Sequence, residues 1–328
     1  MESCPRIYRP RRPQQTPLYR LLESLYEPVK LAWEERFETR YGFWQGCWDS
    51  AVARYLDCGV WEHGFARVRC GECRYEMLVA FSCKQRELCP SCAAKRGAEL
   101  AAFLVDHVLE DVGHAQWVFT IPKMLRQLFF RRRELRGVLA RLAWQTVQKL
   151  MAAAAFEPEL RPGMVSVIQT FGDRINPHPH VHALVSRGGW TRDDRFVPIP
   201  YVDPLAAQRL FRHQVFAFLL REELISLERI ELLSSWRRSG FSVHNSVYVS
   251  SGDQQAVEAL VRYMMRPPVS LARLRLLPGK DQVLHFPKTG GGDDPGSTRP
   301  EPIDAMDYVA RVLAQIPPPR KHLVRYHG

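Results

Sequence analysis

The chain has 328 residues, of which 46% are hydrophobic and 25% charged, a composition typical of folded globular proteins with about two domains. Lysine and arginine outnumber aspartate and glutamate by 46 to 35, so the formal net charge is +11 and nucleic acid is the expected partner. The sequence has no apolar run of about 18 residues, which excludes a membrane-spanning helix. No apolar signal-peptide core follows Met1, which favours the cytoplasm.

In chain order, a basic arm at residues 1–16 precedes a helical, cysteine-rich region and then mixed helices and strands. Helical periodicity predicts helices at about 28–41, 44–57, 95–109, 124–154, 203–235, 251–266 and 303–315. Short β-branched or alternating runs predict strands at about 65–69, 77–81, 117–121, 165–171, 176–185 and 241–249. Glycine, proline and serine predict a loop at 289–300.

Four cysteines form two pairs separated by fifteen residues, Cys70-x-x-Cys73 and Cys89-x-x-Cys92. Each pair offers two thiolates from one tight turn, and two turns complete a tetrahedral zinc site. Such a site is closed to substrate, so we expect a structural zinc. Three further side chains are interpreted as small buried groups, with a second zinc as the alternative: Cys58, His63 and Cys83.

Three histidines stand at alternate positions in one predicted strand: His178, His180 and His182. Alternate side chains of a strand share one face, so the imidazoles form a row while Val181, Ala183 and Val185 face a core. Neutral imidazole binds divalent metal, and an open coordination position can polarise a phosphate oxygen. The alternative is a row of histidines satisfied by ordinary hydrogen bonds.

The third ligand of such an ion, beyond His180 and His182, is left open by the sequence. The candidates are His178, Gln169 and His244. A metallo-β-lactamase site also begins with His-x-His but then requires Asp-His, where this chain has Ala183 and Leu184.

Tyr263 is the candidate nucleophile that a metal at this row would activate. It stands near the end of a predicted helix, flanked by Arg262 and Arg266. A phenol is a weak nucleophile unless its anion is stabilised, and two guanidinium groups can stabilise it and bind phosphate oxygens. The alternative is a tyrosine that packs against its neighbours.

At these residues the chain resembles the rolling-circle insertion-sequence transposases of the HUH endonuclease class, including those of common-region elements. The resemblance covers nearly the whole chain. It rests on segments whose order and spacing agree with the family: 64–70, Cys89-Pro90-Ser91-Cys92, 167–172, His180-Val181-His182, 241–244, 262–268 and 317–328.

The resemblance implies an α+β fold, with a helical, zinc-ribbon-like, DNA-binding domain at 1–110 and an HUH-type catalytic domain at 111–328. In the latter, helices flank an antiparallel sheet. It implies that His180 and His182 hold Mg²⁺ or Mn²⁺ and that Tyr263 attacks single-stranded DNA at the element ends. The product would be a 5′-phosphotyrosine and a free 3′-OH.

This chain resembles the single-tyrosine form, because Ala259 and Pro267 stand where a second tyrosine would be. One nucleophile must be reused or supplied by a second copy, so a homo-oligomer is an expectation. The chain also stops where relatives continue, which raises the expectation of a truncated copy. Two alternatives stay open: a replication initiator or relaxase, and a non-catalytic, zinc-dependent DNA-binding remnant.

Overall fold

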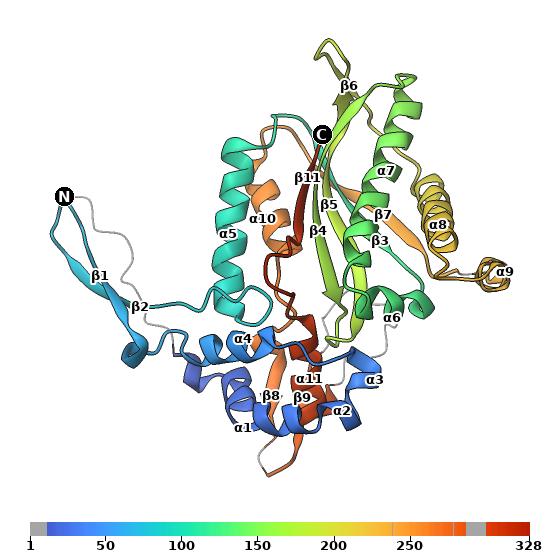
Figure 1. Ribbon diagram of the computed structural model, residues 1–328. Coiled ribbons are helices and arrows are strands. Elements are labelled where there is room, and N and C mark those ends of the chain that lie inside the picture. The colour runs from blue at the N-terminus through green and yellow to red at the C-terminus, as the bar shows by residue number, and fades with distance from the viewer. Residues whose placement is uncertain (1–11, 238, 278, 287–299) are drawn as a thin grey trace. The chain divides into compact units, whose positions relative to one another are not determined.

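A computed structural model describes residues 12–237, 239–277, 279–286 and 300–328 (Figure 1). Most of the predicted arm and of the predicted loop at 289–300 lie outside these residues. Contacts between Cα atoms divide the chain into two compact units, of which the first comprises residues 1–96, 173–176 and 267–319. The second comprises residues 97–172, 177–266 and 320–328. The predicted domain boundary at residue 110 stays a prediction.

The first unit contains helices, a two-stranded hairpin and a small sheet. Its helices are α1 (Pro17–Leu31), α2 (Trp33–Arg36), α3 (Glu38–Tyr41), α4 (Cys47–Leu56), the start of α5 (Pro90–His107) and α11 (Ala305–Gln315). The hairpin joins β1 (Phe65–Arg69) to β2 (Glu76–Ala80), and the sheet joins β8 (Leu274–Leu276), β9 (Gln282–His285) and β10 (Glu301–Asp304). Edge-on contacts among Trp33, Trp44 and Trp48 help to close its helical core.

The second unit is built on a six-stranded antiparallel sheet. Five strands follow the order β11 (Val324–His327), β4 (Arg161–Phe171), β5 (Pro177–Trp190), β3 (His114–Thr120) and β7 (Ser242–Val249), and β6 (Phe196–Pro198) pairs with β5. Its helices are most of α5, α6 (Lys123–Arg131), α7 (Leu135–Ala155), α8 (Pro204–Arg221), α9 (Leu227–Ser235) and α10 (Gln254–Met264). The predicted α+β class is confirmed.

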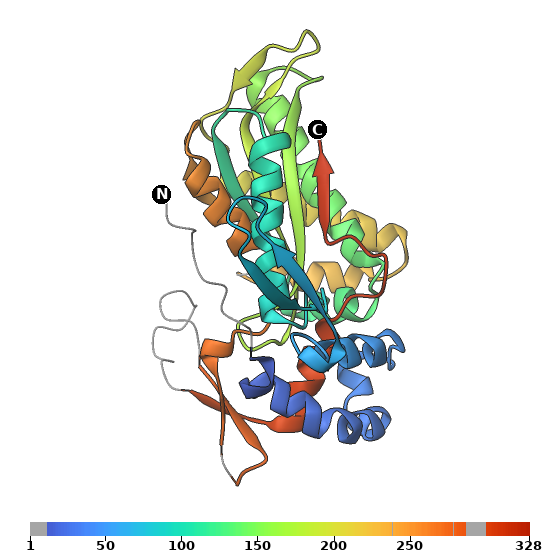
Figure 2. The ribbon, with the colours of Figure 1, turned by 90° about the vertical axis from the view of Figure 1, so that its left-hand side faces the viewer.

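The two faces of this sheet carry different helices (Figure 1). On one face, Trp117, Phe119 and Val181 pack in a large core with residues of α6, α7 and α8. On the other face, Val165, Val167 and Leu184 pack against α5 and α10. Figure 2 looks onto this second side and shows α5 in front of the strands. Because the helices separate in this way, side chains at even and odd positions of β5 meet different surroundings.

Several predicted helices have different boundaries in the structure. The predicted helix at 28–41 is α1 to α3, and Pro28 lies inside α1 rather than at a first helical position. Thr16 instead caps α1 and accepts a hydrogen bond from the Tyr19 amide. The predicted helix at 124–154 is divided into α6 and α7, and the one at 203–235 into α8 and α9.

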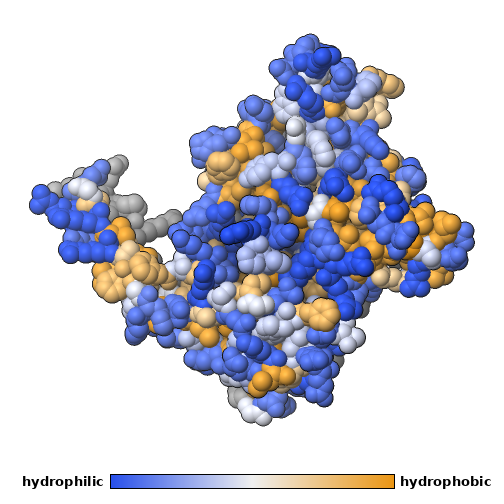
Figure 3. Space-filling view, viewed as in Figure 1, coloured by the Kyte–Doolittle hydropathy of each residue, from blue (hydrophilic) through white to orange (hydrophobic). Residues whose placement is uncertain are grey.

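The β1–β2 hairpin exposes most of its side chains, among them the apolar Phe65, Leu78 and Phe81. Figure 3 shows apolar surface at the base of this hairpin and a second, extensive apolar area on the right-hand side of the view. Among the residues that the structure describes, no helix is both long and apolar enough to cross a membrane.

Candidate active site and zinc-binding cluster

The alternation predicted for β5 is confirmed. Val181, Ala183 and Val185 are fully buried in the core shared with α7 and α8. His180 and His182 lie on the opposite face and are also buried, with only 5% and 3% of their surface exposed. Their Nε2 atoms are 3.1 Å apart. Two nitrogens bound about 2.1 Å from one ion at a right angle would be about 3.0 Å apart, so the pair has the spacing of adjacent metal ligands.

The other ring nitrogen of each histidine is held by a second group. His180 Nδ1 lies 2.6 Å from the His178 carbonyl oxygen, to which it donates its proton, so the Nε2 lone pair of His180 remains available. His182 Nδ1 lies 3.1 Å from the side-chain amide of Gln116 on β3. An amide can donate or accept according to how it is turned, so Gln116 can support either tautomer of His182.

Two buried polar atoms near the pair make no hydrogen bond with any described residue. Gln169 is paired with His180 across β4 and β5; its Nε2 donates to the Met264 carbonyl oxygen at 2.6 Å, but its Oε1 has no donor. His178, whose ring centroid is 4.7 Å from that of His180, has a similar unpartnered Nε2. Buried polar atoms are normally satisfied, so both are available as a third ligand.

His244 is not brought close to the pair. It stands on β7, where it is paired with Val118 of the central strand β3. His182 is paired with the same Val118 from β5, on the other side of β3. Two strand spacings, about 10 Å, therefore separate the backbones of the two histidines. Its side chain is exposed.

Tyr263 is carried to the histidines by α10. Asp253 caps this helix by accepting a hydrogen bond from the Ala256 amide, and Val257, Val261 and Met264 bury its apolar face. The Tyr263 ring, 46% exposed, meets the His182 ring edge-on at a centroid distance of 5.8 Å.

A glycine on α5 allows α10 to approach. A Cβ atom at Gly97 would lie 3.3 Å from Met265 Cβ and 4.0 Å from Arg262 Cα. A larger side chain at this position would crowd the end of α10 that carries Tyr263.

The two flanking arginines are placed differently. The Arg266 guanidinium lies over the Tyr263 ring, 4.6 Å from its centroid, and its buried Nε has no acceptor among the described residues. Arg262 instead forms an ion pair with Glu258, one helical turn earlier, at 2.6 Å. Arg266 is therefore the arginine in contact with the tyrosine, and it has a donor to offer a phosphate oxygen.

Sequence reasoning missed two neighbours of the row. Gln116 is a polar residue between the apolar Ala115 and Trp117 of β3, and that polar position was the available signal. Arg126 on α6 is half-buried and donates from Nε to the Ile121 carbonyl oxygen. Its charge adds to the lowering of the pKa values of His178 and His180, but nothing local in the sequence places it there.

Burial keeps the row of imidazoles neutral. It lowers the pKa of His178 to about 3 and that of His180 to about 4, with nearby positive groups adding to both effects. The pKa of His182 is also well below its usual value, mainly because of burial. Neutral imidazole is the form that binds metal, so the row is ready to act as a ligand set near pH 7.

A second cluster lies in the first unit and consists of four buried thiols whose Sγ atoms lie within 4.8 Å of one another: Cys58, Cys83, Cys89 and Cys92. Three of the separations are 3.9, 3.8 and 3.5 Å. Thiolates bound tetrahedrally at about 2.3 Å from one zinc ion would be about 3.8 Å apart, so the cluster fits zinc. Hydrogen bonding to Cys83, then to Cys89, lowers the pKa of Cys58, whereas hydrogen bonding to Cys58 raises the pKa values of Cys83 and Cys89, so a bound metal ion would displace the remaining protons of the cluster.

This set differs from the predicted one, because it contains Cys89 and Cys92 but neither Cys70 nor Cys73. The β1–β2 hairpin explains the difference. Its open end is fixed by a hydrogen bond from the Gly59 amide to the Phe81 carbonyl oxygen, which brings Cys58 and Cys83 together. Cys70 and Cys73 are at the turn, about five residues or 16 Å along the strands. The third spare candidate, His63, pairs with Asp57 at 3.2 Å.

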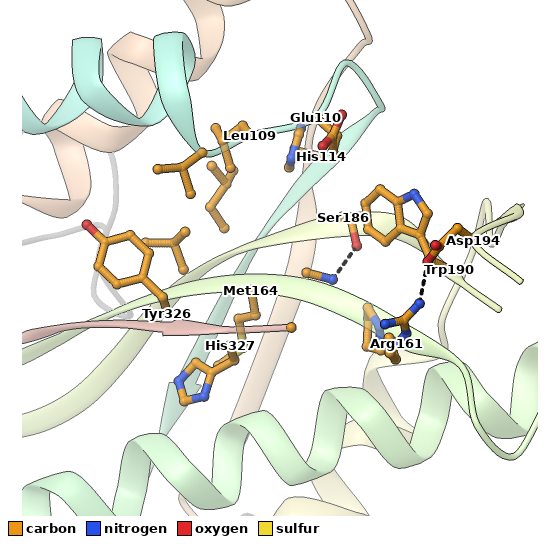
Figure 4. A pocket seen from close by; sticks show the side chains of 16 residues that line it. Leu109, Glu110, His114, Arg161, Met164, Ser186, Trp190, Asp194, Tyr326 and His327 are labelled. Carbon is orange, nitrogen blue, oxygen red and sulfur yellow. Dashed lines mark hydrogen bonds and ion pairs between the residues drawn. The ribbon is translucent and has the colours of Figure 1, made fainter. Parts of the chain in front are cut away.

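A cavity with a volume of about 690 Å³ lies elsewhere on the sheet of the second unit (Figure 4). Leu109, His114, Ser186 and Tyr326 line it, and Trp190 stands at one end. Ser186 Oγ accepts a hydrogen bond from the Gly163 amide at 2.9 Å, and Arg161 pairs with Asp194 at 2.6 Å. None of the predicted site residues lines this cavity.

Comparison with known proteins decides the family. Residues 163–328, just over half of the chain, match the sequence family described as "Putative transposase". The chain belongs to this transposase family. Residues 32–121 also match the family described as "Transposase zinc-binding domain", and this range contains all four clustered cysteines.

Two relatives of the transposase are similar over most of its length. The "Transposase for insertion sequence element IS801" of Pseudomonas savastanoi pv. phaseolicola is 29% identical, over 84% of this chain and 68% of the relative. The "Putative transposase y4qJ" of Sinorhizobium fredii is 23% identical, over 79% of this chain and 68% of the relative. No solved structure matches the transposase.

The buried histidines of the transposase predict a pH dependence of its stability. Their pKa values are lower in the folded protein than the usual 6.5, so the unfolded chain takes up protons first as the pH falls. We expect the free energy of unfolding, measured by urea denaturation without added divalent ions, to fall between pH 6.5 and about 4. An H180N/H182N variant should show a flatter profile, and an equally steep one would contradict the burial of neutral imidazoles.

Proposed function

We propose that the transposase nicks and rejoins single-stranded DNA, with Tyr263 as the nucleophile and a divalent ion, Mg²⁺ or Mn²⁺, held by His180 and His182. The observation that carries this proposal is the edge-on contact of the Tyr263 ring with His182, whose Nε2 converges with that of His180. A nucleophile and a ligand pair from separate elements are thereby close to one small volume. Membership of a transposase family supports DNA as the substrate.

The proposed reaction is a transesterification. The Tyr263 oxygen attacks the phosphorus and loses its proton to solvent, while the bond from phosphorus to the 3′ oxygen breaks. The leaving 3′ oxygen takes a proton from solvent and becomes a 3′-OH. The enzyme retains a 5′-phosphotyrosine. Attack by a 3′-OH on this linkage reverses the exchange and joins the strands, so no external energy source is needed. A bound ion would supply Lewis-acid polarisation of the phosphate oxygen.

The residues of the chain have separable tasks in this proposal. Gln169 Oε1 or His178 Nε2 completes the ligand set, since each is buried without a partner among the described residues. Gln116 orients His182. Arg266 lies over the phenol ring and provides positive charge for the phenolate and the phosphate. Arg262, which is paired with Glu258, adds a second guanidinium group to the helix that carries the nucleophile.

Single-stranded DNA suits this arrangement because the tyrosine oxygen must approach the phosphorus in line with the leaving oxygen, and a duplex obstructs that approach. The net charge of +11 favours a polyanionic substrate. Tyr263 is the tyrosine in contact with the row, so we propose that it is reused, or that a second copy of the chain supplies another, to complete strand transfer.

We also propose that residues 1–110 form the zinc-binding, DNA-binding part and that residues 111–328 catalyse the reaction. Within the former, we assign the structural zinc to the four clustered thiols, Cys58, Cys83, Cys89 and Cys92, because their spacing fits a zinc tetrahedron.

The nucleophile is tested by Tyr263→Phe. This change removes the attacking oxygen and keeps the ring against His182. We expect wild-type protein with Mn²⁺ to form a covalent adduct with labelled single-stranded DNA that survives denaturing electrophoresis, and the variant to form none while still binding DNA. Exposed Tyr201→Phe is the matched control and should retain the adduct. An adduct of undiminished yield in Tyr263→Phe would refute the assignment.

The zinc ligands are tested by pairs of serine substitutions. We expect C58S/C83S protein to lose its zinc and the folding of the cysteine-rich part, because metal binding and folding are coupled in such sites. C70S/C73S protein, altered at the hairpin turn, should retain one zinc per chain. Zinc content measured by atomic absorption decides between the two sets, and loss of zinc in C70S/C73S alone would restore the set predicted from spacing.

A further inference from the structure

A groove of about 480 Å³ lies between α7 and α8 in the second unit. Its charged or titratable lining residues come from both helices and are all potentially cationic: Arg141, Lys149, His213 and Arg221. They follow helical spacing, since residues 141 and 149 lie two turns apart on α7, and residues 213 and 221 two turns apart on α8. No aspartate or glutamate of the described residues lines the groove, so it presents a concentrated positive field.

A buried side-chain amide, that of Gln214, forms part of the wall of the groove. Thr146 Oγ1 lies 2.9 Å from this amide and donates its single proton to the Leu142 carbonyl oxygen at 2.8 Å, so the amide of Gln214 donates to the hydroxyl oxygen. The attraction of the groove for an anion therefore comes from Arg141, Lys149 and Arg221, of which Arg221 also donates to Glu222.

The groove is separated from the proposed nucleophile by the sheet. Residues of α7 and α8 pack on the face that contains Val181, whereas α10, which carries Tyr263, packs on the face that contains Leu184 (Figure 1). A phosphate in the groove therefore cannot be the phosphate that Tyr263 attacks. A reaction that exchanges strands has to hold two DNA segments. One is joined to the enzyme in the covalent intermediate, and the other is the acceptor or the DNA beside the cleaved site.

We propose that the groove between α7 and α8 binds backbone phosphates of a second DNA segment, distinct from the one cleaved. The inference rests on the proposed function for the role of that segment, but the binding itself does not require nicking. A free phosphate ion has the same chemistry as a backbone phosphate, so the two sources have to be separated by experiment.

The test counts DNA strands bound per chain. A labelled single strand of about 15 nucleotides is titrated onto full-length Tyr263→Phe protein, which cannot be lost to covalent product. We expect this protein to bind two strands, and the same protein with R141E/K149E to bind one. The affinity of the altered site should fall at least about tenfold, and the salt dependence of total binding should decrease by about 0.7 in slope for each phosphate that the groove no longer neutralises.

The matched control is R192E/R195E, which reverses two charges on the turn between β5 and β6 and should leave two strands bound. The proposal would be overturned if R141E/K149E protein still bound two strands. It would also be overturned if R141E/K149E and R192E/R195E protein lost DNA binding to the same extent. Displacement of the second strand by inorganic phosphate at low millimolar concentration would also overturn it, because the groove would then take a small anion.

The two proposals are separated by measuring the nicking of a short oligonucleotide by R141E/K149E protein that retains Tyr263. If wild-type protein forms no adduct, the assignment of Tyr263 as the nucleophile fails. The number of strands bound per chain still shows whether the groove binds a second DNA segment.

Discussion

The two-residue alternation of β5 is the constraint on which the candidate active site depends. One set of its side chains, Val181, Ala183 and Val185, is fixed in the core beneath α7 and α8. The same backbone thereby fixes His180 and His182 on the other face, with their Nε2 atoms 3.1 Å apart. A slip of the strand by one residue would turn the apolar set toward α10 and place the imidazoles in the apolar core beneath α7 and α8, so the energetics of folding also determine the geometry of the ligands.

The tyrosine depends on a different kind of packing. Its helix is held to the sheet by Val257, Val261 and Met264, and approaches α5 closely at Gly97. Gln169 links the two parts of the site directly, since it lies beside His180 in the sheet and donates to the carbonyl oxygen of Met264 next to the nucleophile. A change in that hydrogen bond would therefore alter both the ligand set and the position of Tyr263.

Local periodicity was sufficient to predict the parts of the fold that the site requires. The strand of histidines, the strand before it and the helix of Tyr263 follow from spacings of two and of about 3.6 residues. The breaks of the long helices at 132–134 and 222–226 were not predicted, because neither break contains a proline or a glycine. The neighbours Gln116 and Arg126 become visible only when β3 and α6 are placed beside β5, which depends on strand order rather than on any local pattern.

The cysteines show the same distinction between spacing and topology. Two knuckles at a suitable distance predict that a zinc site exists, but not which thiols meet. Pairing of β1 with β2 brings the residues before and after the hairpin together and carries those at its turn away. Cys58 and Cys83, which have no knuckle spacing, consequently join Cys89 and Cys92. Register across a hairpin cannot be read from the separation of cysteines along the chain.

The most direct test of this account is a crystal structure of the protein soaked with Mn²⁺, in which anomalous scattering locates the ion. The account predicts one ion bound by Nε2 of both His180 and His182, at about 2.2 Å, with the Tyr263 hydroxyl facing the same volume. An ion bound elsewhere, or a Tyr263 hydroxyl directed away from both imidazoles with α10 firmly packed, would contradict it.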